Sequence, residues 1–224
     1  MKTLLLLGLL LLATCANAAQ FEIGAGIARA QTNGNGTWYQ DGFAHAMKLT
    51  QPALELGARG RLTSHMDWHV DAVSLGRYSV NSQDTPRDSN YSATSRTHCN
   101  GRCLPLANYI GSGRVLGIQA LLSRHTRGAW QLGVEAGPFL YHETWRMDVP
   151  NWYPPSGPIT PISTYGSQWA VGAVLGATLA NGPWQLALRY YSDGAGFAGH
   201  AGGWPPLWRG QVLVMLSRSF WGAL

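Results

Sequence analysis

The sequence predicts an all-β protein, a closed eight-stranded antiparallel up-and-down β-barrel that spans a membrane. Three tryptophans each follow a tight turn and open a strand in which apolar and polar residues alternate, namely Trp68, Trp130 and Trp184. The other strand ends are separated by long polar connections, at residues 32–50, 81–112, 146–166 and 193–206. Short turns that alternate with long loops, with aromatic residues at strand ends, are typical of transmembrane barrels.

The composition favours a membrane barrel over a water-soluble fold. Charged residues make up 12% of the chain and hydrophobic residues 46%, whereas soluble domains carry about 25% charged residues. Alternation explains this balance, because lipid-facing apolar residues are interleaved with small or polar lumen residues and no long apolar run appears. A soluble β-sandwich also alternates, but strand 168–180 would then leave a large apolar face in water.

The N-terminus has the features of an export signal, so residues 1–18 are expected to be a signal peptide and residues 19–224 the barrel domain. A lysine and an apolar run precede Ala16-Asn17-Ala18, which matches a small-residue cleavage site. The run is shorter than the roughly 20 residues that a membrane-spanning helix needs. A lipoprotein signal would use Cys15, but Thr14 is a poor fit before a lipidated cysteine.

The first four strands are predicted from period-two alternation, which sends one set of side chains toward lipid and the other toward the lumen. Their ranges and their outward residues are 21–30 (Phe21, Ile23, Ala25, Ile27), 53–63 (Leu54, Leu56, Ala58, Leu62), 68–80 (Trp68, Val70, Ala72, Tyr78) and 114–125 (Leu116, Ile118, Ala120, Leu122). Arg77 is expected to face inward.

The last four strands follow the same pattern. Their ranges and outward residues are 130 to about 145 (Leu132, Val134, Ala136, Leu140), 168–180 (Trp169, Val171, Ala173, Leu175, Ala177, Leu179), 184 to about 192 (Leu186, Leu188, Tyr190) and 208–220 (Trp208, Val212, Val214, Leu216, Phe220). Each strand is near the 9–11 residues that cross a bilayer. An even number of strands places both termini on the periplasmic side.

Aromatic residues near strand ends are expected at the membrane interfaces. They are Trp68, Trp130, Trp184, Trp169, Trp208 and Phe220, with Trp145, Tyr78 and Tyr190 added to the outer girdle.

Charged residues on lumen positions are expected to pair, because eight strands leave room for side chains and little water. They are Glu55, Arg59, Arg61, Asp71, Glu135 and Arg189, with the two signs in similar number. Such a set either seals the barrel or forms a polar binding pocket or proton site.

Two cysteines remain after the signal, Cys99 and Cys103, on either side of an Asn-Gly turn. In an exported chain this spacing favours a local disulfide that closes a loop tip. The alternatives are free thiols or a metal site with His98, which lacks enough ligands. We therefore expect no metal and no cofactor.

The basic residues are scattered along the chain, so the net charge of +5 indicates no nucleic-acid surface. Anionic lipopolysaccharide is the expected partner of loop and rim arginines.

The whole mature chain resembles the small eight-stranded outer-membrane barrels of the OmpA-transmembrane and OmpX type. Its Cys99-Asn100-Gly101-Arg102-Cys103 segment, with Leu104-Pro105 and Gly111-Ser112-Gly113, also resembles barrels without an established activity that are encoded in proteobacterial and phage genomes. The resemblance implies a monomer in the outer membrane of a Gram-negative bacterium, in contact with outer-membrane lipid and lipopolysaccharide.

Two functions remain open from the sequence. The loops are rich in Tyr, Trp, Asn, Ser and Gly, which make adaptable contact surfaces, so a structural or adhesive role with an extracellular protein or phage partner is expected. The alternative is a lipid A-modifying hydrolase, because residues 189–194 resemble the late motif of lipid A deacylases, with Ser192 at the nucleophile position. Tyr190 stands where that family has its histidine base, so His200 or His142 would have to activate Ser192, beside Asp193.

Overall fold

A computed structural model describes residues 19–31, 50–84, 107–152, 158–200 and 210–221. These residues form a closed antiparallel barrel in which each strand pairs with its neighbours in sequence and β1 pairs with β8. The strands are β1 (Gln20–Gln31), β2 (Thr50–Thr63), β3 (Met66–Asp84), β4 (Ala107–His125), β5 (Gln131–Trp152), β6 (Thr160–Asn181), β7 (Trp184–His200) and β8 (Gly210–Trp221). The predicted eight-stranded antiparallel barrel is confirmed, and the two-sheet sandwich is excluded.

Alternation along each strand divides the barrel wall into two faces. On β1, Phe21, Ile23 and Ile27 point outward and are 43–58% exposed, whereas Glu22 and Ala28 point inward and are 1% exposed. The other strands repeat this division. We call the outward residues that share this apolar, exposed character the apolar belt: Phe21, Ile23, Ile27, Leu54, Leu56, Val70, Leu116, Ile118, Leu122, Leu132, Val134, Leu140, Val171, Leu175, Leu186, Leu188, Val212, Val214 and Leu216.

The two ends of the barrel differ. Tight turns join β2 to β3 and β6 to β7, and a short segment joins β4 to β5, all at one end, which we call the short-turn end. The start of β1 and the end of β8 lie there as well, because Gln20 pairs with Trp221 and with Arg59, near the turn between β2 and β3. The opposite end, where β1 leads to β2 and β3 leads to β4 through residues outside the described ranges, is called the long-connection end.

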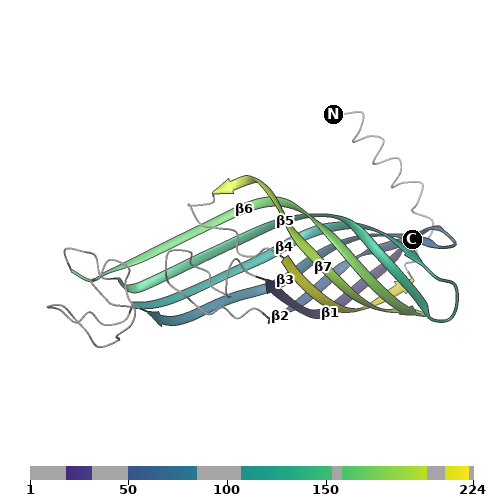
Figure 1. The fold of residues 1–224 in the computed structure, drawn as a ribbon, viewed down its shortest axis with the longest axis horizontal. Helices are drawn as coiled ribbons and strands as arrows, with labels where there is room; N and C mark the ends of the chain where they lie inside the picture. The colour runs from purple at the N-terminus through teal and green to yellow at the C-terminus, as the bar shows by residue number, and fades with distance from the viewer. Residues whose placement is uncertain (1–18, 32–49, 85–106, 153–157, 201–209, 222–224) are drawn as a thin grey trace.

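At the long-connection end, four strands continue beyond the rest of the wall (Figure 1). Pairing of β3 with β4 reaches Asp84 and Ala107, and pairing of β5 with β6 reaches Trp152 and Thr160. From His142 to Trp152, β5 runs on for roughly 33 Å of extended strand. We call this part of β3, β4, β5 and β6 the extension.

The extension corrects the predicted long connections. Most of residues 146–166, the start of 193–206 and both ends of 81–112 are strand rather than loop. On β5 the outward residues in this region include polar Arg146 and Asp148, while inward Met147 and Val149 are buried. Alternation therefore continues past the belt, but the outward face of β5 is polar there, so in sequence this segment resembles a solvated loop.

A bulge in β3 corrects two side-chain directions. The pairing of β3 with β4 shifts between Ser74 and Arg77, and Gly76 within the bulge has a φ of 91°. One extra residue reverses the alternation, so Tyr78 points inward, 1% exposed, and Arg77 points outward. The prediction of Tyr78 in the outer girdle and Arg77 in the lumen was therefore wrong.

Trp145 is also placed on the inner side, 3% exposed, and does not belong to an outer girdle. Alternation on β5 runs without interruption from Glu135 to Val149, so odd-numbered residues face inward throughout.

Within the described ranges, no helix is long and apolar enough to cross a membrane. Residues 1–18, Cys99, Cys103 and Trp208 lie outside these ranges, so the expectations for them stay predictions.

Candidate functional site

The middle of the lumen holds an ion network centred on Arg189 of β7. Its guanidinium donates hydrogen bonds to Glu135 on β5 and to Glu55 on β2. All three side chains are at most 2% exposed. Buried charges are stable only when paired, so this contact ties three non-adjacent strands together across the lumen.

The network continues through neutral groups. The side-chain amide of Gln119 on β4 donates to Glu55 and to Asp71 on β3, both at 3.0 Å. The hydroxyl of Tyr191 donates to the Gln119 carbonyl oxygen at 2.8 Å. Five strands thereby contribute to one connected cluster, which we call the lumen network: Glu55, Asp71, Gln119, Glu135, Arg189 and Tyr191.

Further layers fill the lumen on either side of the network. Toward the long-connection end, the Phe139 ring stacks on Tyr141 at 5.2 Å and meets Tyr191 edge-on at 4.9 Å. Toward the short-turn end, Glu22 lies 3.6 Å from His69, whose ring contacts the Ser123 hydroxyl at 3.3 Å. An eight-stranded barrel has an interior just wide enough for such side chains.

The structure places the predicted lumen charges at different levels. Glu55, Asp71, Glu135 and Arg189 share the lumen network, while half-buried Arg59 donates to Gln185 at 3.2 Å nearer the short-turn end. Arg61 lies outside the lumen, with a 66% exposed side chain 3.8 Å from Asp67. Arg61 lies beside the β2–β3 turn and lines the open cavity at the short-turn end together with Arg59, so its position at the rim leaves the side chain exposed.

Sequence reasoning missed the two neutral members of the network. Gln119 and Tyr191 lie on inward positions of β4 and β7, so alternation places them in the lumen, but it does not indicate which neutral side chains bond to the buried charges. Buried acids also outnumber buried arginines among the described residues, contrary to the expected balance: Glu22, Glu55, Asp71, Glu135 and Glu143 against Arg189. Within the described ranges, no group of three or more His, Cys, Asp or Glu side chains is placed to hold a metal ion.

The residues of the hydrolase hypothesis are not brought together. The Ser192 hydroxyl donates to the Ala173 carbonyl at 3.4 Å and accepts from the Ala173 amide at 3.2 Å. His200 pairs with Ser167 further along β7, roughly 26 Å of strand away. His142 packs on Trp169, with ring centroids 4.8 Å apart, two strands from Ser192. A serine nucleophile needs an adjacent base, and neither His142 nor His200 is positioned to serve as one.

Replacing Ser192 with Ala is expected to leave the lipid A of expressing cells unchanged. The hydroxyl supports the backbone of β6, so its loss costs about 1 kcal/mol of stability and no chemistry. Mass spectrometry of lipid A from cells with wild type, Ser192→Ala or empty vector measures this. A modified lipid A that requires the serine contradicts the expectation.

Aromatic side chains mark both edges of the apolar belt. At the short-turn end, Trp130 and Trp184 are 62% and 46% exposed, and the Arg218 guanidinium lies 5.2 Å from the Trp184 ring and 5.1 Å from the Phe220 ring. Trp68 is half-buried and covers Gly60. Toward the long-connection end, Trp169 is 43% exposed.

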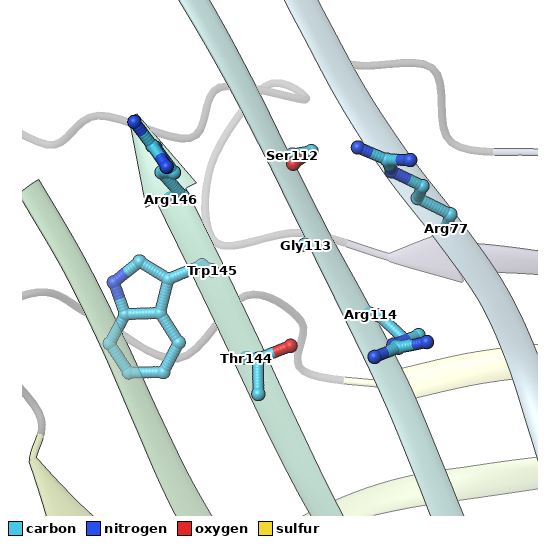
Figure 2. Close-up of a pocket in the computed structure, with 7 residues that line it drawn as sticks. All are labelled: Arg77, Ser112, Gly113, Arg114, Thr144, Trp145 and Arg146. Carbon is cyan, nitrogen blue, oxygen red and sulfur yellow. The ribbon is translucent and has the colours of Figure 1, made fainter. Parts of the chain in front are cut away.

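A second polar site lies on the outer wall, at the base of the extension. An open cavity of about 340 Å³ is lined by Arg77, Ser112, Gly113, Arg114, Thr144, Trp145 and Arg146. Figure 2 shows the Arg77 and Arg114 side chains reaching into the space between β3 and β4, with Ser112 and Thr144 beside them and Arg146 further along β5.

The three arginines of this cavity differ in their partners. Arg146 donates to Asp148 at 2.8 and 3.0 Å. A hydrogen bond from Ser163, and then Arg146, lowers the pKa of Asp148, which lies beyond the apolar belt. The carboxylate therefore stays ionised and holds Arg146. Arg77 and Arg114 have no acidic partner among the described residues.

No protein-family model and no curated protein matches the chain in sequence. Among solved structures, the chain is similar to Ail, the attachment invasion locus protein of Yersinia pestis, with 10% identity and a TM-score of 0.46 over 90% of this chain and 97% of Ail. A complex of Ail with the heparin analogue sucrose octasulfate gives 10% identity and a TM-score of 0.43 over the same shares. Neisserial surface protein A gives 15% identity and a TM-score of 0.41, over 91% of this chain and all of that protein. These similarities concern the fold alone.

Proposed function

We propose that the protein is an outer-membrane barrel with a closed lumen, which acts at the cell surface through its long-connection end. The apolar belt supports membrane insertion, because apolar side chains on every strand face outward around a wall without free edges. Only helices and closed barrels satisfy all backbone groups inside a bilayer. The short-turn end, with the start of β1 and the end of β8, then faces the periplasm.

The observation that carries the proposal is the lumen network. Arg189, Glu55 and Glu135 meet across the lumen, and packed aromatic rings lie next to them. Permeation through this section would require a buried ion cluster to separate. A role in diffusion is therefore disfavoured, and the surfaces of the barrel remain to perform the function.

The extension is the part of the wall best placed for contact with a partner. It carries exposed Tyr165, Ile162 and Ile110 on strands held by continuous pairing, and aromatic residues on a rigid scaffold are effective binding anchors. We propose an adhesive or recognition role toward an extracellular protein or a phage, with lipopolysaccharide as the lipid neighbour and with a monomeric barrel.

Orientation is tested with single cysteines in a Cys99→Ser/Cys103→Ser background. A membrane-impermeant maleimide is expected to label Tyr165→Cys in intact cells, because Tyr165 is 72% exposed on the extension. Arg127→Cys at the short-turn end is the matched control and is expected to react only after permeabilisation. Labelling of Arg127→Cys in intact cells would reverse the proposed orientation.

Closure is tested by recording the purified, folded protein in planar bilayers. We expect no stable conductance steps, since the side chains of the lumen network fill the eight-stranded barrel. A porin of known conductance is the positive control for insertion, and a heat-dependent gel shift verifies that the sample is folded. Regular open-channel steps from folded protein would contradict a closed lumen.

The surface role is tested with a trimmed variant. Arg146 pairs with Tyr165, so replacing residues 147–164 with Asn-Gly closes the hairpin at that pair. Cells with wild type are expected to adhere to epithelial monolayers or matrix-coated glass, or to adsorb phage, more than cells with equal amounts of the trimmed variant. Equal results for wild type, trimmed variant and empty vector in all assays would count against the proposal.

A further inference from the structure

The starting observation is a pair of like charges on the outer wall. Arg77 on β3 and Arg114 on β4 are direct cross-strand partners, and both side chains are exposed. Like charges directly opposite each other destabilise a strand pair. Neither arginine has an acidic partner within the described residues, so this part of the chain provides no group that neutralises the pair.

The second observation is that a β-bulge orients one member of the pair. The bulge at Gly76 turns Arg77 from the inner to the outer face. Without this bulge, the alternation that puts Val73 and Leu75 inside would put Arg77 inside as well. The outward position of Arg77 beside Arg114 therefore depends on a local backbone feature, and Arg77 in this position lines the cavity with Ser112 and Thr144.

The third observation is the level of the cavity relative to the apolar belt. On β4, Leu122, Ile118 and Leu116 are apolar outward positions, and Arg114 is the next outward position after Leu116. Leu116 pairs with His142, which packs on Trp169. Because Trp residues mark the membrane interface, Arg114 and Arg77 lie at the level of lipid headgroups.

We propose that this cavity binds a phosphate group of an outer-leaflet lipid, with Arg77 and Arg114 as the charged donors and Ser112 and Thr144 as neutral donors. The proposal rests on the proposed membrane insertion. Guanidinium groups bind phosphate through two parallel hydrogen bonds, and a phosphate between Arg77 and Arg114 removes their repulsion. The cavity opens on the lipid-facing wall, directly above apolar side chains, which favours a lipid-borne phosphate over a soluble anion.

Arg146 has a different part in this site. Its guanidinium is held by Asp148, so it borders the cavity without a free charge. The phosphate-binding charge is therefore expected to reside in Arg77 and Arg114. A bound lipid phosphate would attach the base of the extension to the outer leaflet, where β3, β4 and β5 leave the belt.

The experiment titrates detergent-purified full chain with lipid A, in dodecyl maltoside micelles that carry no phosphate, and counts bound lipid by native mass spectrometry. Diphosphorylated lipid A is compared with dephosphorylated lipid A of the same acyl chains. Wild type is expected to prefer the phosphorylated form by at least about tenfold, and Arg77→Gln/Arg114→Gln to lose that preference, because hydrogen bonds to charged groups are of this strength.

The matched control is Arg124→Gln/Arg127→Gln, which removes two exposed charges, one at the opposite end of β4 and one in the segment that follows it, and is expected to keep the preference. Equal preference in wild type and Arg77→Gln/Arg114→Gln overturns the proposal, as does equal loss in both double variants. Complete displacement of lipid A by millimolar inorganic phosphate would show a site for free anions and overturn the lipid source. A heat-dependent gel shift in all variants separates these results from a failure of the barrel proposal, in which wild type itself would not insert.

Discussion

Replacing Arg189 with Met is expected to lower the free energy of unfolding by about 3–5 kcal/mol. Arg189 is 1% exposed and donates to both Glu135 and Glu55. The substitution leaves two buried carboxylates without a cation, and removing one partner of a buried ion pair costs more than the pair contributes when intact. Urea titration of the protein folded into lipid vesicles, followed by tryptophan fluorescence, measures the change.

Two further variants separate charge from packing. Combining Arg189→Met with Glu55→Gln and Glu135→Gln is expected to recover most of the stability, because neutral groups replace the whole cluster. Arg61→Met, at an exposed position near Asp67, is expected to change stability by less than about 1 kcal/mol. If Arg189→Met is as stable as Arg61→Met, the lumen network has no structural role.

Replacing Gly76 with Ala is expected to destabilise the barrel by about 2–5 kcal/mol. Gly76 has a φ of 91°, where an L-residue costs roughly 1–2 kcal/mol. A Cβ at this position would lie 2.4 Å from the Gln51 Cβ and 2.7 Å from the Pro52 carbonyl oxygen on β2, and such overpacking adds about 1–3 kcal/mol. The same urea titration gives the value.

Gly182→Ala measures the cost of a side chain at positive φ without a steric clash. Gly182 also has a positive φ, 58°, but a Cβ there meets nothing within 4 Å, so a loss of about 1 kcal/mol is expected. Equal losses at Gly76 and Gly182 would mean that the contact with β2 contributes nothing. The Gly76 variant should also weaken lipid A binding, because the bulge directs Arg77 to the outer wall.

The candidate site was only partly predictable from sequence. Alternation on β2, β3, β5 and β7 placed Glu55, Asp71, Glu135 and Arg189 on the inner face, since direction there depends on neighbours in sequence. Which of them meet depends on strand register and barrel closure, and these bring Gln119 and Tyr191 into the same cluster. Arg61 shows the limit of alternation, because its place at the rim beside a turn leaves the side chain exposed.

By itself, the sequence determined the all-β class, the number and order of strands and the apolar outer face, because period-two alternation and tight turns are local properties of the chain. Only the tertiary structure decided the reversal at Gly76, the length of the extension and the meeting of Arg77 with Arg114. A bulge is defined by a mismatch between two paired strands, and a strand with polar outward residues is distinguished from a loop only by the partner to which it is hydrogen-bonded.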